Sequence, residues 1–211
     1  ALAEMMVGRK VALTVERKQR PPGPVVLRTA SLATASAAGE VALQGVSFEL
    51  HAGEILGVAG VAGNGQRELL EVLAGMTRPA SGRVFVDARE ISPTSNLDAL
   101  SMRRLGIAHV PEDRLRTGLV STFTAAESSI LGVHREPQFD GPGGMRWFWS
   151  TAGIRAHCEA CISAFDVRPP DPELRTGGFS GGNQQKLLLA REVATAPKIL
   201  LVGQPTRGVD I

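Results

Sequence analysis

The sequence predicts an α/β fold that carries a phosphate-binding loop, together with a helical and loop-rich subdomain. Three observations support this prediction. A short apolar run leads into a Gly-rich frame that starts at Gly60 and opens a helix, which gives the order strand, loop, helix. A second helix opens with two glycines at 181–182 and is followed by another apolar run. The stretch between them, from about 114 to 178, has a helical and loop-rich pattern.

The composition is that of an ordinary globular chain. Its 211 residues suit one domain, or one domain with a subdomain, and 43% hydrophobic with 21% charged residues is a usual balance. The formal net charge of +2 is too small to indicate a nucleic-acid partner. No apolar run approaches the roughly 20 residues that a membrane-spanning helix needs, and the N-terminus lacks the pattern of a secretory signal.

The expected elements follow in order along the chain. Residues 1–24 are interpreted as a tail and linker, because a charged stretch precedes a Pro-rich one. The apolar run at 54–60 predicts a buried strand, and apolar residues at helical spacing after Gly65 predict a helix that stops at Gly75. A further helix is expected from 181 to about 196. The other expected strands cover 25–34, 41–50, 82–90, 105–110 and 198–203.

The Gly-rich frame has the spacing of a phosphate-binding loop but lacks its two characteristic polar residues. Gly60 to Gly65 match G-x-x-x-x-G, and the next two residues should be Lys and then Ser or Thr. They are Gln66 and Arg67 instead. Gln66 brings no charge to a polyanion, while Arg67 can reach phosphate but cannot bind magnesium. By itself, the frame fits a plain Gly-rich turn at least as well as a nucleotide site.

The second helix that begins with glycines, at 181–182, favours a nucleotide-binding protein over a plain Gly-rich turn. Ser180 can cap the helix, and the two glycines after it leave backbone N–H groups bare at the positive end, where a phosphate can bind. A plain Ser-capped helix does not explain the Asn-Gln-Gln-Lys that follows the glycines. It also does not explain the Gln-Pro-Thr at 204–206 after the apolar strand.

Together these segments resemble the motifs of ATP-binding-cassette (ABC) ATPases. FSGGNQQK at 179–186 is similar to the signature motif, usually L-S-G-G-Q, and KILLVGQPTRGVD at 198–210 is similar to the Walker B strand and D-loop. The motif order fits from about 25 to 211. The resemblance implies a P-loop NTPase core with a mixed sheet plus a helical subdomain at about 114–178. It also implies that the domain, at 25–211, is truncated after the D-loop, its C-terminal part absent.

The resemblance narrows to the second ATPase half of tandem importers for sugars or nucleosides. MMVGRK and the Pro-rich linker look like the joint that follows a preceding ATPase half, which assigns 1–24 to that joint. IAHVPEDRLRTGLV at 107–120 is similar to the Q-loop region of these proteins, with Glu112 in the usual Gln position. The Gly-rich loop and the D-loop look more like the nucleoside branch than the ribose branch.

By the same resemblance, the catalytic roles of the Walker motifs are vacant. Besides Gln66 and Arg67, Gly203 stands where the Walker B Asp is usual, and Gln204 stands where the catalytic Glu is usual. Gln204 can orient water but cannot take its proton, so the site is expected not to hydrolyse ATP and to hold no metal. The candidate catalytic positions are Gln204 and Glu112. The candidate nucleotide-contacting residues are Gly60, Gly63, Asn64, Gly65, Gln66, Arg67, Ser180, Gly181, Gly182, Asn183, Gln184 and Asp210.

The signature implies a role in trans. In this family two cassettes face head to tail, so each signature serves the nucleotide of its partner. Ser180, Gly181 and Gly182 would clamp the γ-phosphate of an ATP that a second ATPase half, with intact Walker motifs and Mg²⁺, holds, and Asp210 would line the interface. The implied partners are that half, membrane permease subunits and, indirectly, a solute-binding protein, with the chain peripheral at the cytoplasmic face of the membrane.

Two side-chain groups have simple structural interpretations. Trp147, Phe148 and Trp149 are expected in the core of the subdomain rather than on a surface that contacts the permease. Cys158 and Cys161 recur at helical spacing with neighbouring apolar residues, which favours buried thiols over metal or redox chemistry.

Two other functions stay open at this point. A non-catalytic scaffold or remnant ABC domain would fold without binding nucleotide. A soluble ABC protein of translation or repair would be expected to have two hydrolysis-capable halves.

Overall fold

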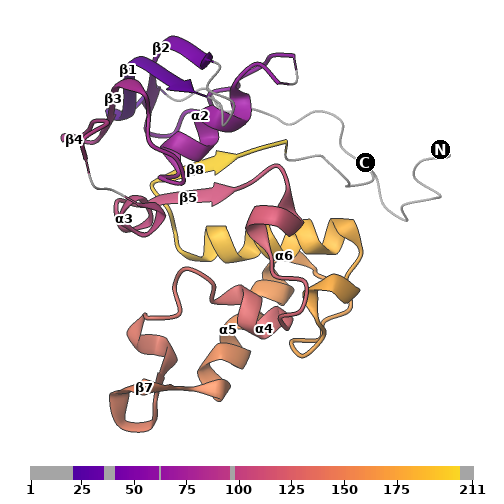
Figure 1. Ribbon diagram of the computed structural model, residues 1–211. Helices are drawn as coiled ribbons and strands as arrows, with labels where there is room; N and C mark the ends of the chain where they lie inside the picture. The colour runs from indigo at the N-terminus through magenta and orange to yellow at the C-terminus, as the bar shows by residue number, and fades with distance from the viewer. Residues whose placement is uncertain (1–20, 36–40, 62, 96–97, 205–211) are drawn as a thin grey trace, which may run out of the picture.

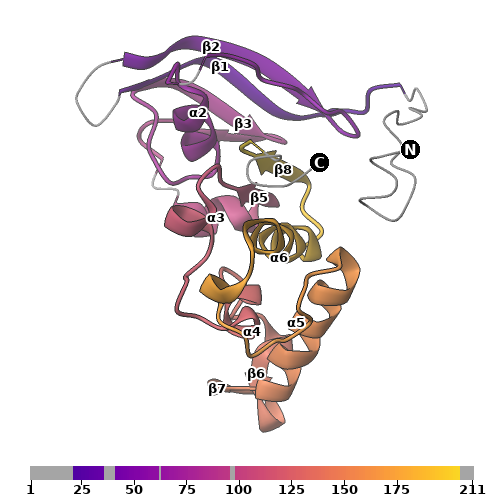
Figure 2. The ribbon, with the colours of Figure 1, turned by 90° about the vertical axis from the view of Figure 1, so that its right-hand side faces the viewer.

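The computed structural model describes residues 21–35, 41–61, 63–95 and 98–204, which form two lobes, one above the other in the view of Figure 1. Of the predicted tail at 1–24, residues 1–20 therefore lie outside the described residues. One lobe contains the first four strands, and the other contains most of the helices. Figure 2 shows the sheet of the first lobe and the strand β7 at opposite ends of the molecule.

The first lobe is built on a four-stranded antiparallel sheet in the order β2-β1-β3-β4. Its strands are β1 (Val25–Ala35), β2 (Val41–His51), β3 (Ser81–Val86) and β4 (Arg89–Ile91). A separate parallel pair lies beside it, formed by β5 (Ile107–Val110) and β8 (Ile199–Val202). These strands confirm the periodicity-based predictions. The expected mixed sheet is present as an antiparallel part and a parallel part, which are not hydrogen-bonded to each other among the described strands.

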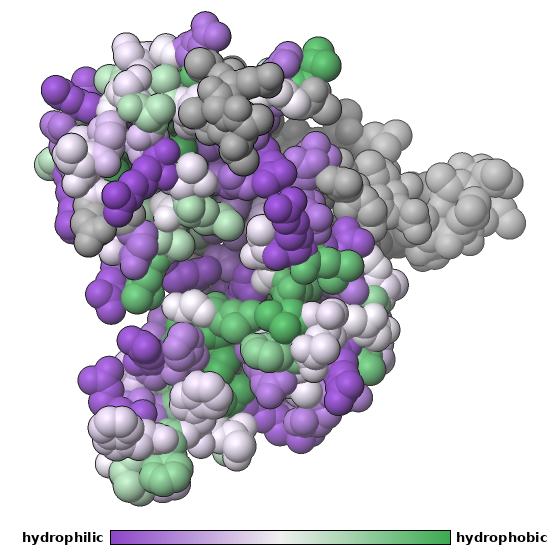
Figure 3. Space-filling model, viewed as in Figure 1, coloured by the Kyte–Doolittle hydropathy of each residue, from purple (hydrophilic) through white to green (hydrophobic). Residues whose placement is uncertain are grey.

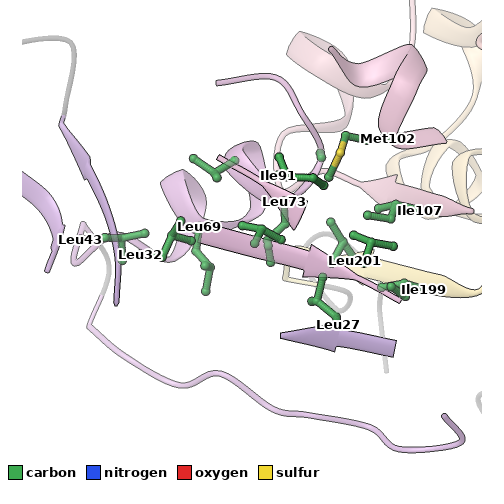
Figure 4. Close-up of a cluster of buried hydrophobic side chains, with 14 residues drawn as sticks. Leu27, Leu32, Leu43, Leu69, Leu73, Ile91, Met102, Ile107, Ile199 and Leu201 are labelled. Carbon is green, nitrogen blue, oxygen red and sulfur yellow. The ribbon is translucent and has the colours of Figure 1, made fainter. Parts of the chain in front are cut away.

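Helix α2 (Gln66–Leu73) packs between the two sheets and completes the core of the first lobe. Leu69 and Leu73 of α2 meet Leu27 of β1 and Leu201 of β8 in this core (Figure 4). The helix ends where predicted, because Gly75 takes the left-handed conformation, with φ of 73°, just past the C-cap. The short α3 (Ala99–Arg104) follows the sheet and is capped by the side chain of Asp98.

The second lobe packs three helices around its own core. They are α4 (Ala125–Ser129), α5 (Thr151–Phe165) and α6 (Gly181–Ala194). The short elements are the π-helical η1 (Arg114–Gly118), the 3₁₀ turns η2 (Pro137–Phe139), η3 (Pro142–Gly144) and η4 (Thr176–Gly178), and the strands β6 (Asp140–Gly141) and β7 (Met145–Trp149). The helical, loop-rich character of the stretch was predicted; the β6–β7 hairpin was not.

A buried ionic network on α6 ties the lobes together. The Glu192 carboxylate is fully buried and accepts two hydrogen bonds from Arg103 of α3, at 2.9 and 2.7 Å, and one from Arg191, at 2.8 Å. Arg191 also donates to the carbonyl of Gly118, at 2.8 Å. Burial lowers the pKa of Arg191, and the neighbouring Glu192 opposes that shift. The network therefore joins α3 in the first lobe to α6 and η1.

The predicted buried strand at 54–60 is wrong. The segment forms no strand, and its apolar side chains are exposed, with Ile55 at 87% and Val58 at 58%. A strand needs a hydrogen-bonding neighbour, and the described strands supply none to this segment. An apolar run indicates only that burial of its side chains is favourable. It does not indicate whether a neighbouring strand is present to pair with it.

Of the two predictions of buried side chains, the one for the cysteines is confirmed and the one for the aromatic residues at 147–149 is wrong. Cys158 and Cys161 lie on the buried face of α5, as predicted, and burial raises the pKa of the Cys158 thiol to about 12. The prediction that Trp147, Phe148 and Trp149 lie in the core is wrong, because they are 94%, 65% and 58% exposed. All of β7 is exposed, since among the described elements only the short β6 pairs with it and no helix covers it.

Candidate functional site

The Gly-rich loop has the backbone of a turn that only glycine adopts without strain. Gly63 and Gly65 have φ of 89° and 93°, in the left-handed region. Gly65 is the N-cap residue of α2 and provides no side chain to cap it, so the helix start is left to backbone groups. Gly60, Gly63 and Asn64 are exposed. The loop thus presents backbone groups to solvent at the start of α2, as a phosphate-binding loop does.

The side chain of Gln66 closes back on this loop. Its Nε2 donates a hydrogen bond to the carbonyl of Val61, at 3.0 Å. A Cβ added at Gly60 would collide with the same amide nitrogen. The residue in the lysine position is therefore bonded to the loop itself, and it leaves the loop without a positive charge.

The side chain of Arg67 is bonded along α2. Its Nε lies 2.8 Å from Oε1 of Glu71, one turn further on. The hydrogen bond to Glu71 raises the pKa of Arg67, and the charges of Glu71, Glu68 and Glu112 act in the same direction. The positive charge of the guanidinium therefore balances the negative charges of nearby carboxylates on α2 and on the chain after β5.

A cavity of about 150 Å³ lies between α2, the end of β5 and η1. Side chains of both signs line it, among them Arg67, Glu71, Glu112 and Arg116. His109 of β5 also lines it, and burial lowers the pKa of its imidazole. Because cations and anions face one another here, the cavity has no single charge that would select a polyanion.

The two residues in the Walker B positions lie where the carboxyl ends of β5 and β8 meet. The N–H of Gly203 donates to the carbonyl of Val110, at 2.9 Å, which extends the strand pairing past β8. A Cβ at Gly203 would lie 2.9 Å from the backbone nitrogen of Glu112 and 3.1 Å from Cδ1 of Leu70, closer than a side chain tolerates. Gln204 is exposed, with φ of 45°. The structure thus brings Glu112 close to the Walker B positions, and an Asp at 203 would require the backbone at Glu112 to shift.

These residues do not fit a magnesium nucleotide bound at the loop of this chain. The residue in the Lys position is Gln66, the residue in the Ser/Thr position is paired with Glu71, and no carboxylate stands at 203. Within the described ranges, no group of three His, Cys, Asp or Glu side chains is arranged to hold a metal ion.

The signature residues form a second group at the start of α6. Ser180 is the exposed N-cap residue. The prediction that its hydroxyl caps the helix is wrong, because the hydroxyl makes no hydrogen bond to the helix backbone. It accepts a hydrogen bond from Nδ2 of Asn183 instead, at 2.8 Å. Nothing lies within 4 Å of a Cβ built at Gly182, so this face is open. The first N–H groups of a helix have no intrahelical acceptor. The start of α6 is thus accessible, and its first N–H groups are of the kind that can bind an anion.

Asn183 and Gln184 support this helix start from behind. Oδ1 of Asn183 accepts from the backbone N–H of Arg168, at 2.7 Å. Gln184 is 5% exposed, accepts from Nε of Arg114 at 3.0 Å and donates to the carbonyl of Thr176 at 3.0 Å. The Gln184 side chain is thus turned inward, and its nucleotide contact stays a prediction. The motif spacing marked Gln184 as part of the signature, but only the fold shows which way its amide points.

The remaining candidate, Asp210, lies outside the described residues. No sequence motif marks Arg103, Arg168 or Glu192, although they hold the start and the end of α6 in place. Each acts through a partner far away in the chain or through a backbone group, so no local motif marks it.

A scan against protein-family models matches residues 43–207 to the model described as ABC transporter. Among curated proteins, the chain is 40% identical to the glucose import ATP-binding protein of Haloferax volcanii and 38% identical to a nucleoside import ATP-binding protein of Lactococcus lactis. It is 36% identical to a ribose import ATP-binding protein of Chromobacterium violaceum. Each match covers 100% of this chain but only 37%, 40% and 39% of the relative. The chain thus spans about two fifths of their length.

Solved structures agree with the fold. A dimeric ATP-binding cassette in a post-hydrolysis state, bound to ADP and Pi, has a TM-score of 0.68 at 24% identity, covering 87% of this chain and 76% of that chain. A nucleotide-free ATP-binding cassette from an ABC transporter has a TM-score of 0.66 at 20% identity, covering 86% and 70%. No helix in the described part of this chain is long and apolar enough to cross a bilayer.

Proposed function

The chain belongs to the ABC transporter family, and we propose that it is an ATP-binding cassette of an importer for simple sugars or nucleosides. Its own Walker site would be degenerate, and its signature would complete the ATP site of a partner cassette. The names of the glucose, nucleoside and ribose import relatives support this class of solute. The proposal includes the division into a linker at 1–24 and a cassette at 25–211, with its helical subdomain at about 114–178. The nucleoside branch stays a prediction.

The observation that carries the proposal is the contrast between the two anion-binding segments. At the loop, Gln66 is bonded to the loop backbone and Arg67 is bonded to Glu71. At the start of α6, Ser180 is exposed and the space beside Gly182 is open. A chain that uses only its signature would keep the second segment accessible and have no need of the first.

In the proposed mechanism this chain stabilises the negative charge of the γ-phosphate and supplies no general base. ATP with Mg²⁺, held by the partner cassette, supplies the γ-phosphoryl group that is hydrolysed. The Ser180 hydroxyl and the backbone N–H groups of Gly181 and Gly182 would donate hydrogen bonds to its oxygens at the positive end of α6. Asn183 would hold the Ser180 hydroxyl in place. Gln204 would accept no proton, so water activation would be left to the partner.

The proposed partners are a second ATPase half with intact Walker motifs, permease subunits and, indirectly, a solute-binding protein. The chain would be peripheral at the cytoplasmic face of the membrane. The dimeric arrangement of a cassette of similar fold, which is bound to ADP and Pi, supports a two-cassette assembly. Asp210 would line the interface between the cassettes.

The test is ATP hydrolysis by the assembled importer complex, with wild-type chain and with Ser180→Arg. We expect turnover to fall by about a hundredfold or more, because the substitution removes a donor and fills the phosphate-facing space. Ser163→Arg is the matched control, since Ser163 is an exposed serine on α5 of the same lobe. Its turnover should match the wild type.

A non-catalytic scaffold is the second candidate, and the closed loop at Gln66 favours it. In that case Ser180→Arg would leave turnover unchanged. A soluble ABC protein would not co-purify with a permease, so recovery of the complex from membranes distinguishes it from the importer. Magnesium-dependent hydrolysis by this chain alone would contradict the degenerate site.

A further inference from the structure

Strand β7 carries an apolar surface that the proposed function does not use. Met145, Trp147, Phe148 and Trp149 are 50%, 94%, 65% and 58% exposed. In Figures 1 and 2, β7 lies at the end of the molecule farthest from the four-stranded sheet. The same end of Figure 3 is pale green to near white, the colours of apolar and weakly polar residues. We call these four residues with Arg146 the β7 tip.

The hairpin is held firmly although its tip is exposed. Gly141 of β6 packs against the Cβ and backbone of Phe148, so closely that a side chain would not fit there. Trp149 makes an edge-on contact with the ring of His134, with centroids 6.2 Å apart. The hydroxyl of Ser150, next in the chain, caps α5 by accepting from the N–H of Gly153, at 3.0 Å. The β7 tip is thus presented by a fixed support on α5.

Arg146 is the charged residue of the tip itself, while Asp140 of β6 pairs with Trp149. From 141 to 154, Arg146 is the only charged residue, and it lies between Met145 and Trp147. Tryptophan combines a large apolar body with an N–H donor, which is why it gathers at the boundary between lipid chains and headgroups. Arginine at the same depth meets acidic headgroups. This chemistry complements the surface of an anionic bilayer.

The shape of the tip favours a bilayer over a protein partner. Side chains on both faces of β7 are exposed, and Trp147 is almost completely exposed, so the tip projects from the second lobe. A projecting apolar group is buried on all sides only by a medium that closes around it, which lipid headgroups and chains do. We propose that the β7 tip inserts into the headgroup region of an anionic lipid bilayer, with Arg146 contacting the acidic headgroups.

This proposal goes beyond the proposed function, which brings the chain to a membrane only through permease subunits. Lipid contact by the β7 tip would give the chain a direct attachment of its own. It requires neither nucleotide nor hydrolysis, so its failure would leave the Ser180 experiment unaffected.

The intrinsic fluorescence of the chain reports directly on the tip. The chain has two tryptophans, Trp147 and Trp149, both in β7, and no tyrosine. The experiment adds vesicles of phosphatidylcholine with one quarter phosphatidylglycerol to the full chain, and in parallel vesicles of phosphatidylcholine alone. With the anionic vesicles we expect the emission to shift to shorter wavelength and quenching by acrylamide to decrease. Neutral vesicles should cause a much smaller change.

Variants separate the apolar and ionic contributions, with binding measured by vesicle co-sedimentation. Phe148→Ser should weaken binding on the order of tenfold, since an apolar side chain of this size loses its burial. Arg146→Gln should weaken it about fivefold, and only with anionic vesicles. Leu100→Ser is the control, because Leu100 is an exposed apolar residue on α3 of the other lobe, and it should bind as the wild type does. Circular dichroism confirms that each variant is folded.

Three outcomes would overturn the proposal. One is unchanged emission with both kinds of vesicle. Another is equal binding to neutral and anionic vesicles, which would remove the role of Arg146. The third is an emission shift that occurs only when permease subunits in detergent are added, which would identify the tip as a protein contact.

Discussion

At the scale of single residues, Gln66 and Arg67 explain how a phosphate-binding loop can keep its backbone and lose its ligand. The glycines at 63 and 65 preserve the left-handed turn. The amide of Gln66 is bonded to Val61, and the guanidinium of Arg67 is bonded to Glu71. Both polar groups that should face a phosphate are satisfied within the chain, so a nucleotide would have to displace them.

The double substitution Gln66→Lys with Arg67→Ser tests this account. We expect ATP affinity to rise by about tenfold or more, because one charge-assisted hydrogen bond to phosphate is restored. Hydrolysis should stay at background, since 203 and 204 still lack carboxylates. Isothermal titration calorimetry with ATP and Mg²⁺ measures the first effect, and phosphate release the second. Measurable turnover in the double variant would show that the Walker B vacancies are not limiting.

At the scale of elements, side-chain hydrogen bonds hold the first turn of α6 in position. Asn183 links the Ser180 hydroxyl to the backbone of Arg168, and Gln184 anchors the first turn from the buried side. The residues after the glycines therefore position the helix end, while the glycines keep its face open. This division explains why Asn and Gln follow the two glycines.

Asn183→Asp tests the charge beside Ser180 at the start of α6 with little change in shape. The carboxylate can still accept from the N–H of Arg168, so the melting temperature should change little. Turnover of the assembled complex should fall about tenfold or more, because a negative charge faces the partner's phosphate. Asn64→Asp makes the same change in the closed loop and should have no effect on turnover. The reverse pattern, with Asn64→Asp alone reducing turnover, would assign the nucleotide to this chain's own loop.

At the scale of the whole molecule, the buried network around Glu192 connects the two lobes. Arg103 belongs to α3 of the first lobe, while Arg191 reaches the carbonyl of Gly118 in η1. A fully buried carboxylate is tolerated only when donors surround it, as they do here. The orientation of α6, and with it the signature, depends on this contact between the lobes.

Glu192→Ala should therefore destabilise the whole chain by about 3–5 kcal/mol, because it leaves the buried Arg191 and the partly buried Arg103 without their carboxylate. Glu159→Ala is the matched control: that glutamate forms an exposed pair with Arg155 on α5, and its loss should cost less than about 1 kcal/mol. Urea unfolding followed by circular dichroism measures both. A loss for Glu192→Ala as small as that of the control would mean that the lobes are held together by other contacts.

The sequence by itself determined the features that depend on residue identity and local spacing. The turn glycines, the end of α2 at Gly75, the strands β1 to β5 and β8, and the length of α6 were all predictable, because near neighbours impose their geometry. The family could also be predicted, since its motifs are short and ordered. The absent Lys and Walker B carboxylates are visible in the sequence without any structure.

Only the tertiary structure decided what depends on distant partners. The apolar run at 54–60 is not a strand because no described strand pairs with it, and Trp147 is exposed because no helix covers β7. Gln184 points inward because Arg114 and Thr176 bind its amide. In each case the local sequence allows burial or exposure, and contacts with residues far away in the chain select between them.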